Sequence, residues 1–99
     1  MKKINVIFDD EFNDVDILLV PDDVAYNIEH VVREFNQWLS LPDNRSRFVV
    51  EVINGYRVIG IGTEEFLWWL NNIQIKAEPK AAILEQHTKL IPNYPCAEF

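Results

Sequence analysis

RFVVEVINGYRVIGI, residues 47–61, carries the strongest structural signal of this 99-residue chain. Two runs rich in β-branched residues, 47–53 and 56–61, stand on either side of Asn54-Gly55. Asn-Gly between such runs is typical of a type I′ turn, because both central residues of that turn need a positive φ. The stretch therefore predicts a β-hairpin.

A helix is predicted on each side of this hairpin. Before it, apolar side chains recur at spacings of three and four over residues 24–39, which is the period of a helix. Asp22 or Asp23 is the expected N-cap of this helix, and Pro42 stops it. After the hairpin, residues 64–72 form a shorter apolar helix with Thr63 as its expected N-cap.

The remaining apolar runs predict three more strands. Residues 3–8 and 15–20 are β-rich and joined closely, which indicates a first hairpin, and residues 81–85 form a last strand. Residues 88–99 are expected to be a partly irregular C-terminal tail. The order β-β-α-β-β-α-β predicts a single α+β domain over residues 1–99, in which both hairpins join a mostly antiparallel sheet and the helices pack on one face.

The charge and composition of the chain favour some classes of function and disfavour others. Sixteen acids against nine bases give a net charge of −7, which disfavours direct nucleic-acid binding and favours a basic protein partner. Cys96 is the single cysteine, so no internal disulfide can form. No apolar run approaches the roughly 20 residues of a membrane span. We therefore expect a cytoplasmic protein that does not act at a membrane.

Motifs for catalysis or metal binding are weak. An EF-hand loop counted from Asp9 lacks the glycine at its sixth position and has Val20 at its twelfth. Cys96, His30 and His87 show no nucleophile–base spacing, and GIGT at residues 60–63 lacks the lysine of a phosphate loop. A looser Mg²⁺ site and an acid–base pair of carboxylates stay open. The prediction is a protein that is not an enzyme and carries no catalytic residues, metal or cofactor.

The stretch FDDEFNDVD, residues 8–16, contains five carboxylates and no base. It is either a solvated loop or a surface for a basic partner. The chain has twelve aromatic residues, more than the predicted apolar stripes clearly need. Tyr56, Trp68 and Tyr94 are the candidates for exposure, and rigid aromatic side chains surrounded by charge are common at protein interfaces. The candidate partner-binding residues are Asp9, Asp10, Glu11, Asp14, Asp16, Tyr56 and Trp68.

Three stretches carry a resemblance to a known family: the acidic residues 8–16, the helical TEEFLWWLNN at residues 63–72, and the ending EQHTKLIPNYPCAEF from residue 85. With these stretches the chain resembles the immunity proteins of bacterial toxin–immunity pairs. It is most similar in character to those of contact-dependent growth inhibition systems. The resemblance implies a tight, noncovalent inhibitor of one cognate toxin, often a nuclease that cleaves tRNA, rRNA or DNA. The acids would then stand in for phosphates in the toxin's basic cleft.

Two other function classes stay open beside this one. A phage-type nucleic-acid mimic, such as an anti-CRISPR protein, would use the same electrostatics against a host nuclease. A small acidic enzyme or ligand-binding domain is the other alternative.

Overall fold

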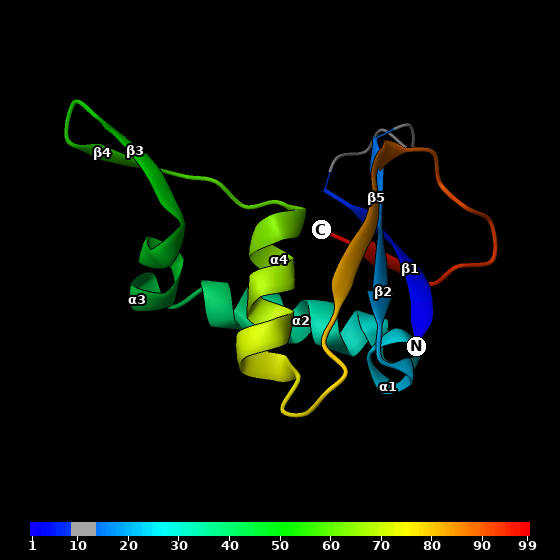
Figure 1. The fold of residues 1–99 in the computed structure, drawn as a ribbon. Coiled ribbons are helices and arrows are strands. Elements are labelled where there is room, and N and C mark those ends of the chain that lie inside the picture. The colour runs from blue at the N-terminus through cyan, green and yellow to red at the C-terminus, as the bar shows by residue number, and fades with distance from the viewer. Residues whose placement is uncertain (9–13) are drawn as a thin grey trace.

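The computed structural model describes residues 1–8 and 14–99 (Figure 1). The strands are β1 (Lys2–Ile7), β2 (Val15–Val20), β3 (Val49–Ile53), β4 (Tyr56–Ile59), β5 (Ala82–Thr88) and β6 (Cys96–Glu98). The helices are α1 (Asp22–Tyr26), α2 (Ile28–Leu39), α3 (Pro42–Arg45) and α4 (Thr63–Trp69). A 3-10 turn, η1 (Ser46–Phe48), follows α3, and a π-helical turn, η2 (Leu70–Gln74), continues α4. None of the helices in this described part of the chain is long and apolar enough to cross a membrane.

The larger sheet has the strand order β5-β2-β1-β6. β1 pairs antiparallel with β2, and β2 pairs antiparallel with β5, whereas β6 lies parallel to β1. β3 and β4 pair antiparallel with each other. The predicted α+β class with mostly antiparallel strands is confirmed.

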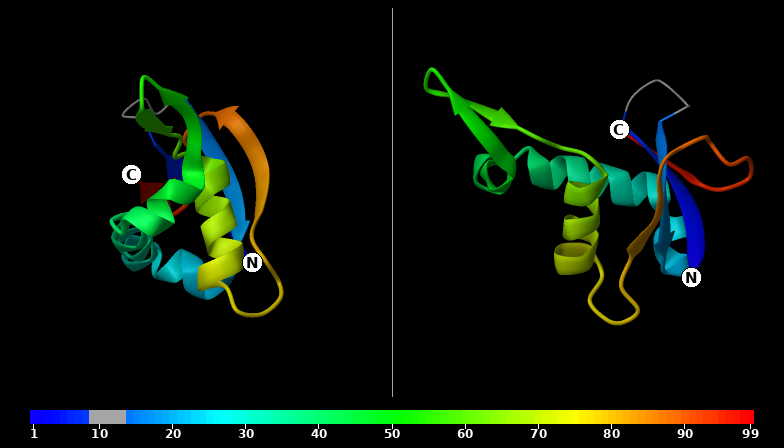
Figure 2. Two further views of the ribbon diagram at one scale, coloured as in Figure 1. Left: turned by 90° about the vertical axis from the view of Figure 1, so that its left-hand side faces the viewer. Right: turned by 45° about the horizontal axis from the view of Figure 1, so that its top comes forward.

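Both faces of the larger sheet are covered. Alternate residues of β1 and β2, such as Ile4, Val6 and Leu18, point to one face, where they form the main core with α1, α2 and α4 (Figure 2). The next residues along each strand, such as Ile7 and Ile17, point to the other face. There the side chains of Leu90, Ile91 and Tyr94 pack over them. The helices therefore lie on one face, as predicted, and the C-terminal segment covers the other.

Asn5 ties that segment to the sheet. Its side chain is fully buried in the middle of β1. Nδ2 donates to the carbonyl of Ile91 at 3.0 Å, and Oδ1 accepts from the Ile91 N–H at 3.1 Å. A buried amide must have such partners to be tolerated, so the two hydrogen bonds fix the C-terminal segment before it returns as β6.

The C-terminal segment is more ordered than the sequence predicts. Residues 96–98 form β6 at the edge of the sheet, with Asn5 opposite Cys96 and Val6 opposite Ala97. This strand is short and follows Pro95, so no local pattern marks it. Only its pairing with β1, some 90 positions earlier in the sequence, makes these residues a strand.

The long helix expected up to residue 39 is interrupted at Asn27. Asn27 has φ −109 and ψ 28, and its Nδ2 donates to the carbonyl of Asp23 at 2.9 Å. A side chain that bonds the backbone locally competes with helix continuation. α2 then runs on with an apolar stripe that ends at the fully buried Phe35.

The expected N-caps are wrong by one position. Pro21 precedes α1, and Asp22 lies in the first turn with its carboxylate 2.8 Å from the amino group of Met1. This hydrogen bond, with the charge of the amino group, lowers the pKa of Asp22. Gly62 precedes α4, and the Glu65 carboxylate accepts from the Gly62 N–H at 2.9 Å. Acidic residues still lie where the positive end of each helix dipole favours them.

The second predicted hairpin forms, but not within the larger sheet. Asn54 and Gly55 have φ 50 and 82, which is the geometry expected for the type I′ turn. β5 and β6 are the outer strands of the larger sheet, and β3 and β4 pair with neither of them. β3 and β4 instead form a separate two-stranded sheet beyond α3. We call residues 49–59 the arm. It projects from the helices (Figures 1 and 2).

Candidate functional site: a projecting arm and an acidic sheet end

The arm holds apolar side chains in water. Tyr56, Val50 and Val52 are 78%, 69% and 63% exposed, and Ile53 and Val58 are also exposed. These five make up most of the large apolar residues classed as exposed in the described chain. The apolar surface is thus concentrated on one element instead of scattered singly, and a concentrated patch marks an interaction surface.

The register of β3 and β4 divides these side chains between two faces. Residues directly opposite in an antiparallel pair share a face. Ile53 lies opposite Tyr56, and Glu51 opposite Val58, so one face is apolar with a single acid. On the other face Val52 lies opposite Arg57. A two-stranded hairpin with apolar groups on both faces is marginally stable alone, and it gains most from a partner that covers it.

Trp68 lies at the base of the arm and not on its surface. It is half-buried in α4, with its ring centroid 6.0 Å from that of Trp38 and 5.9 Å from that of Phe48. The guanidinium of Arg47 lies 5.5 Å from the Trp68 ring centroid, within range of a cation–π contact. This aromatic cluster joins the arm to α2 and α4. Trp68 therefore supports the arm, whereas Tyr56 stands exposed near its tip.

Asp14 and Asp16 lie at the other end of the molecule, at one end of the larger sheet. His87 Nδ1 is 2.7 Å from the Asp14 carboxylate, and the His87 N–H donates to Asp16 Oδ1 at 3.0 Å. The hydrogen bond and charge of Asp14 raise the pKa of His87. We call Asp14, Asp16 and His87 the sheet end. Asp9, Asp10 and Glu11 lie outside the described residues.

The sheet end has the donor types of a metal site. Ligand atoms of Asp14, Asp16 and His87 lie within 4.8 Å of one another. One imidazole nitrogen and two carboxylates suit a divalent cation. Two hydrogen bonds already join the cluster, one from the His87 ring to Asp14 and one from the His87 N–H to Asp16, and Asp14 and His87 are open to solvent. An exposed acidic cluster of this kind is common on protein surfaces without an ion.

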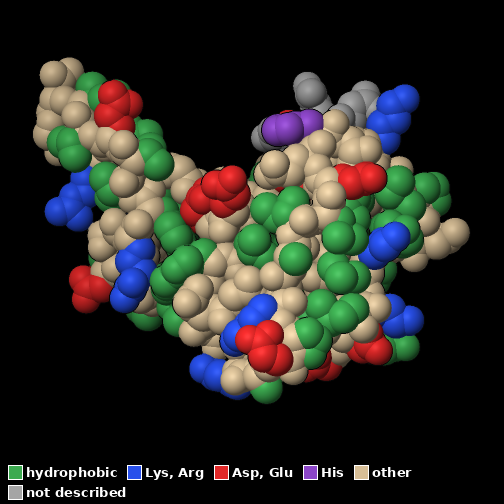
Figure 3. All heavy atoms as spheres, viewed as in Figure 1, with side chains coloured by type: hydrophobic (Ala, Val, Ile, Leu, Met, Phe, Trp, Pro, Cys, Tyr) green, Lys and Arg blue, Asp and Glu red, His purple; other side chains and the backbone are tan. Residues whose placement is uncertain are grey.

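The arm and the sheet end stand on either side of a hollow. Figure 3 shows this hollow between the arm at the left and the sheet at the right, with acidic side chains at its floor. The first turn of α4, which begins in this region, carries Glu64 and Glu65. The candidate residues from the sequence are thus not one cluster: Tyr56 belongs to the arm and Asp14 and Asp16 to the opposite rim.

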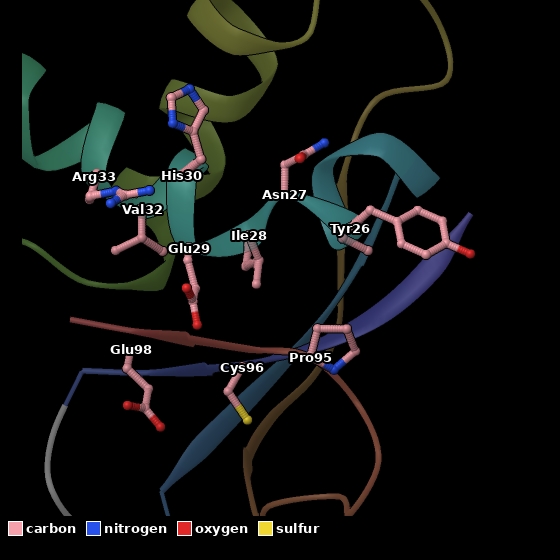
Figure 4. Close-up of a pocket in the computed structure, with 11 residues that line it drawn as sticks. Tyr26, Asn27, Ile28, Glu29, His30, Val32, Arg33, Pro95, Cys96 and Glu98 are labelled. Carbon is pink, nitrogen blue, oxygen red and sulfur yellow. The ribbon is translucent and has the colours of Figure 1, made fainter.

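A larger cavity lies elsewhere, between the α1–α2 junction and β6. It has a volume of about 840 Å³ and is lined by His30, Glu29, Arg33, Cys96 and Glu98, among others. In Figure 4 the His30 ring and the Cys96 sulfur point away from each other. His30 pairs with Glu34 at 2.6 Å, and the Cys96 thiol contacts the amide of Asn5 and the carbonyl of Tyr94. The cavity thus brings no base to the thiol.

Comparisons of the chain with protein-family models, with curated proteins and with solved structures found no match.

Sequence reasoning found Tyr56 and missed the apolar residues around it. The runs VVEVI and YRVI are apolar at both odd and even positions. Such runs are typical of strands buried on both faces, so the pattern by itself does not indicate that these side chains are exposed. The one available signal against burial is charge, since Glu51 and Arg57 interrupt the two runs.

Proposed function

We propose that the chain is an immunity protein that binds a cognate bacterial toxin in the cytoplasm and blocks the toxin's basic substrate cleft. The observation that carries the proposal is the arm. Five large apolar side chains stand exposed on a hairpin that pairs, among the described residues, with no other strand. Buried aromatic and aliphatic anchors supply most of the affinity of a protein complex.

The distribution of charge supports a nuclease as the target. Acidic residues occur at the sheet end and at the floor of the hollow, and the chain carries −7 overall. A nuclease cleft is lined by Lys and Arg that neutralise phosphates. Carboxylates in the hollow would meet the same bases and keep nucleic acid out, while the arm holds the complex together.

The first experiment tests neutralisation. The gene directly upstream of the one for this chain is expressed from an inducible promoter in a host that lacks both genes. We expect its product to arrest growth and the co-expressed chain to restore growth. An upstream product without toxicity, or toxicity that the chain does not relieve, would overturn the proposal.

Two tyrosines provide a matched pair for the arm. Tyr56 and Tyr26 are 78% and 79% exposed, but Tyr26 lies in α1, away from the arm. We expect Tyr56→Ser to weaken toxin binding by at least about tenfold, the effect of an interface anchor. Tyr26→Ser should leave the affinity unchanged. Equal losses from the two variants would remove the arm from the interface.

The salt dependence of the binding rates distinguishes the role of the acidic residues from that of the apolar side chains of the arm. Steering by charge is screened over about 10 Å at 0.1 M ionic strength, so the association rate should fall steeply as salt rises. The dissociation rate should depend chiefly on the arm. Surface plasmon resonance at two salt concentrations measures both rates, and a salt-independent association rate would mean that the acids are only solvated surface.

A further inference from the structure

The second face of the arm borders a pocket with a basic lining. Arg45 and Arg57 line it together with Pro42, Ser46 and Ile59, and no acidic residue is among the lining residues. The pocket is open and has a volume of about 440 Å³. Figure 3 shows basic side chains on the left-hand part of the molecule that carries the arm and α3, with acidic side chains near them.

These two arginines have no acidic partner among the described residues. The ion pairs there join Asp22, Glu34 and Asp14 to other cations. Arg47, the third arginine near the arm, contacts the Trp68 ring. Two guanidinium groups at one pocket that no acidic residue lines give the pocket a local excess of positive charge, and this charge favours an anionic group supplied from outside.

The free edge of β4 lies beside this pocket. Ile53 and Tyr56 flank the two-residue turn, so their backbone groups bond across the hairpin. Hydrogen-bonded and non-hydrogen-bonded pairs alternate along an antiparallel ladder. The next pair, Val52 and Arg57, is therefore not hydrogen-bonded across the hairpin, and the N–H and C=O of Arg57 point outward from β4. The opposite edge of the arm, on β3, carries a bulge at Val50, and bulges discourage strand addition. The β4 edge is therefore the one open to a further strand.

We propose that this pocket is a carboxylate subsite for an acidic, extended segment of the partner protein. The segment pairs with the free edge of β4, and a Glu or Asp opposite Arg57 places its carboxylate between Arg57 and Arg45. Strand addition supplies the backbone hydrogen bonds, and the guanidinium groups select the acidic side chain. Where that partner is the toxin, the inference rests on the proposed function. The basic face of the arm and the acidic hollow then fix a single orientation of the complex.

The direct test uses a peptide and the full chain. The probe is an acetylated and amidated pentapeptide, Thr-Glu-Val-Glu-Thr, and its control has Lys in place of Glu. With ¹⁵N-labelled protein, we expect millimolar Glu peptide to shift the side-chain Nε–H signals of Arg45 and Arg57 and the backbone amides of β4. The Lys peptide should not shift them.

Matched variants locate the effect. Arg45→Gln and Arg57→Gln together should abolish the shifts, whereas Arg33→Gln, which removes an arginine of α2 far from the arm, should leave them intact. Absent shifts, equal shifts with the Lys peptide, or shifts centred on Arg33 would overturn the proposal. Tighter binding of a single-stranded RNA oligonucleotide at the same arginines would overturn it too, because the pocket would then serve phosphate.

The partner gives the second test. Loss of a charge-assisted hydrogen bond costs about tenfold in affinity or more, so Arg45→Gln with Arg57→Gln should weaken toxin binding by at least about tenfold. The failures are distinguishable. A wild-type chain that does not neutralise the toxin overturns the proposed function and leaves the peptide result standing. A neutralising chain whose double variant binds unchanged overturns the subsite alone.

Discussion

Valine-to-threonine substitutions test whether the arm's apolar side chains stand in water. Threonine keeps the size and β-branching of valine, so the strand preference is nearly constant and the hydroxyl is the main change. Val52 is 63% exposed and Val58 also lies in the exposed class, whereas Val20 in β2 is fully buried.

The magnitudes follow from this burial. A hydroxyl forced into the core at Val20 without a partner should cost about 1–3 kcal/mol of the free energy of unfolding. At exposed positions substitutions stay within about 0.5 kcal/mol, so Val52→Thr combined with Val58→Thr should cost less than about 1 kcal/mol. The contrast between core and arm is the prediction.

Urea unfolding followed by tryptophan fluorescence measures these differences. Trp38 and Trp68 report on the base of the arm and Trp69 on the core. The slope with urea should be the same for all variants, which shows that the same surface is exposed on unfolding. If the double variant loses as much stability as Val20→Thr, the arm is packed in solution, and the argument for a free binding surface fails.

Three further predictions concern the sheet end, the C-terminal segment and the arm base. Asp14→Asn should lower the pKa of His87 in an NMR titration. The pKa of His87 is raised in the folded protein, so the His87–Asp14 pair stabilises the fold fully at pH values below the ordinary histidine pKa. This stabilisation is lost as the pH rises through the raised pKa. The Asp14→Asn variant should therefore be less stable than the wild type only at mildly acidic pH. An unchanged His87 pKa would contradict the contact. Asn5→Ala leaves the N–H and C=O of Ile91 without their partner and should cost about 3 kcal/mol, with faster amide exchange in β6; a loss below about 1 kcal/mol would be inconsistent with this role. Trp68→Ala should cost about 2 kcal/mol in urea unfolding, because the ring is only half-buried, and should also speed release of the toxin; release at the wild-type rate would separate the arm base from binding.

Local chemistry was sufficient for much of the secondary structure. Asn54-Gly55 specifies its turn because few other residues adopt two positive φ angles in succession. The apolar stripe through Phe35 specifies α2 because its period fits one face of a helix.

Tertiary structure alone decided where these elements went. β6 exists because Asn5 and its neighbours in β1 offer an edge to residues that local preference leaves irregular. The arm is exposed because β3 and β4 pair only with each other and join neither outer strand of the larger sheet, although the sequence predicts that this hairpin belongs to the sheet. Arg45 of α3 and Arg57 of β4 line the same pocket only because the tertiary structure brings these two elements together. Contacts between near neighbours were enough to specify the Asn54-Gly55 turn, the strands beside it and most of α2, whereas β6 needed its pairing with β1. Edge pairing and burial depend on residues far apart in the chain, and these long-range contacts made an apolar hairpin into the candidate binding surface.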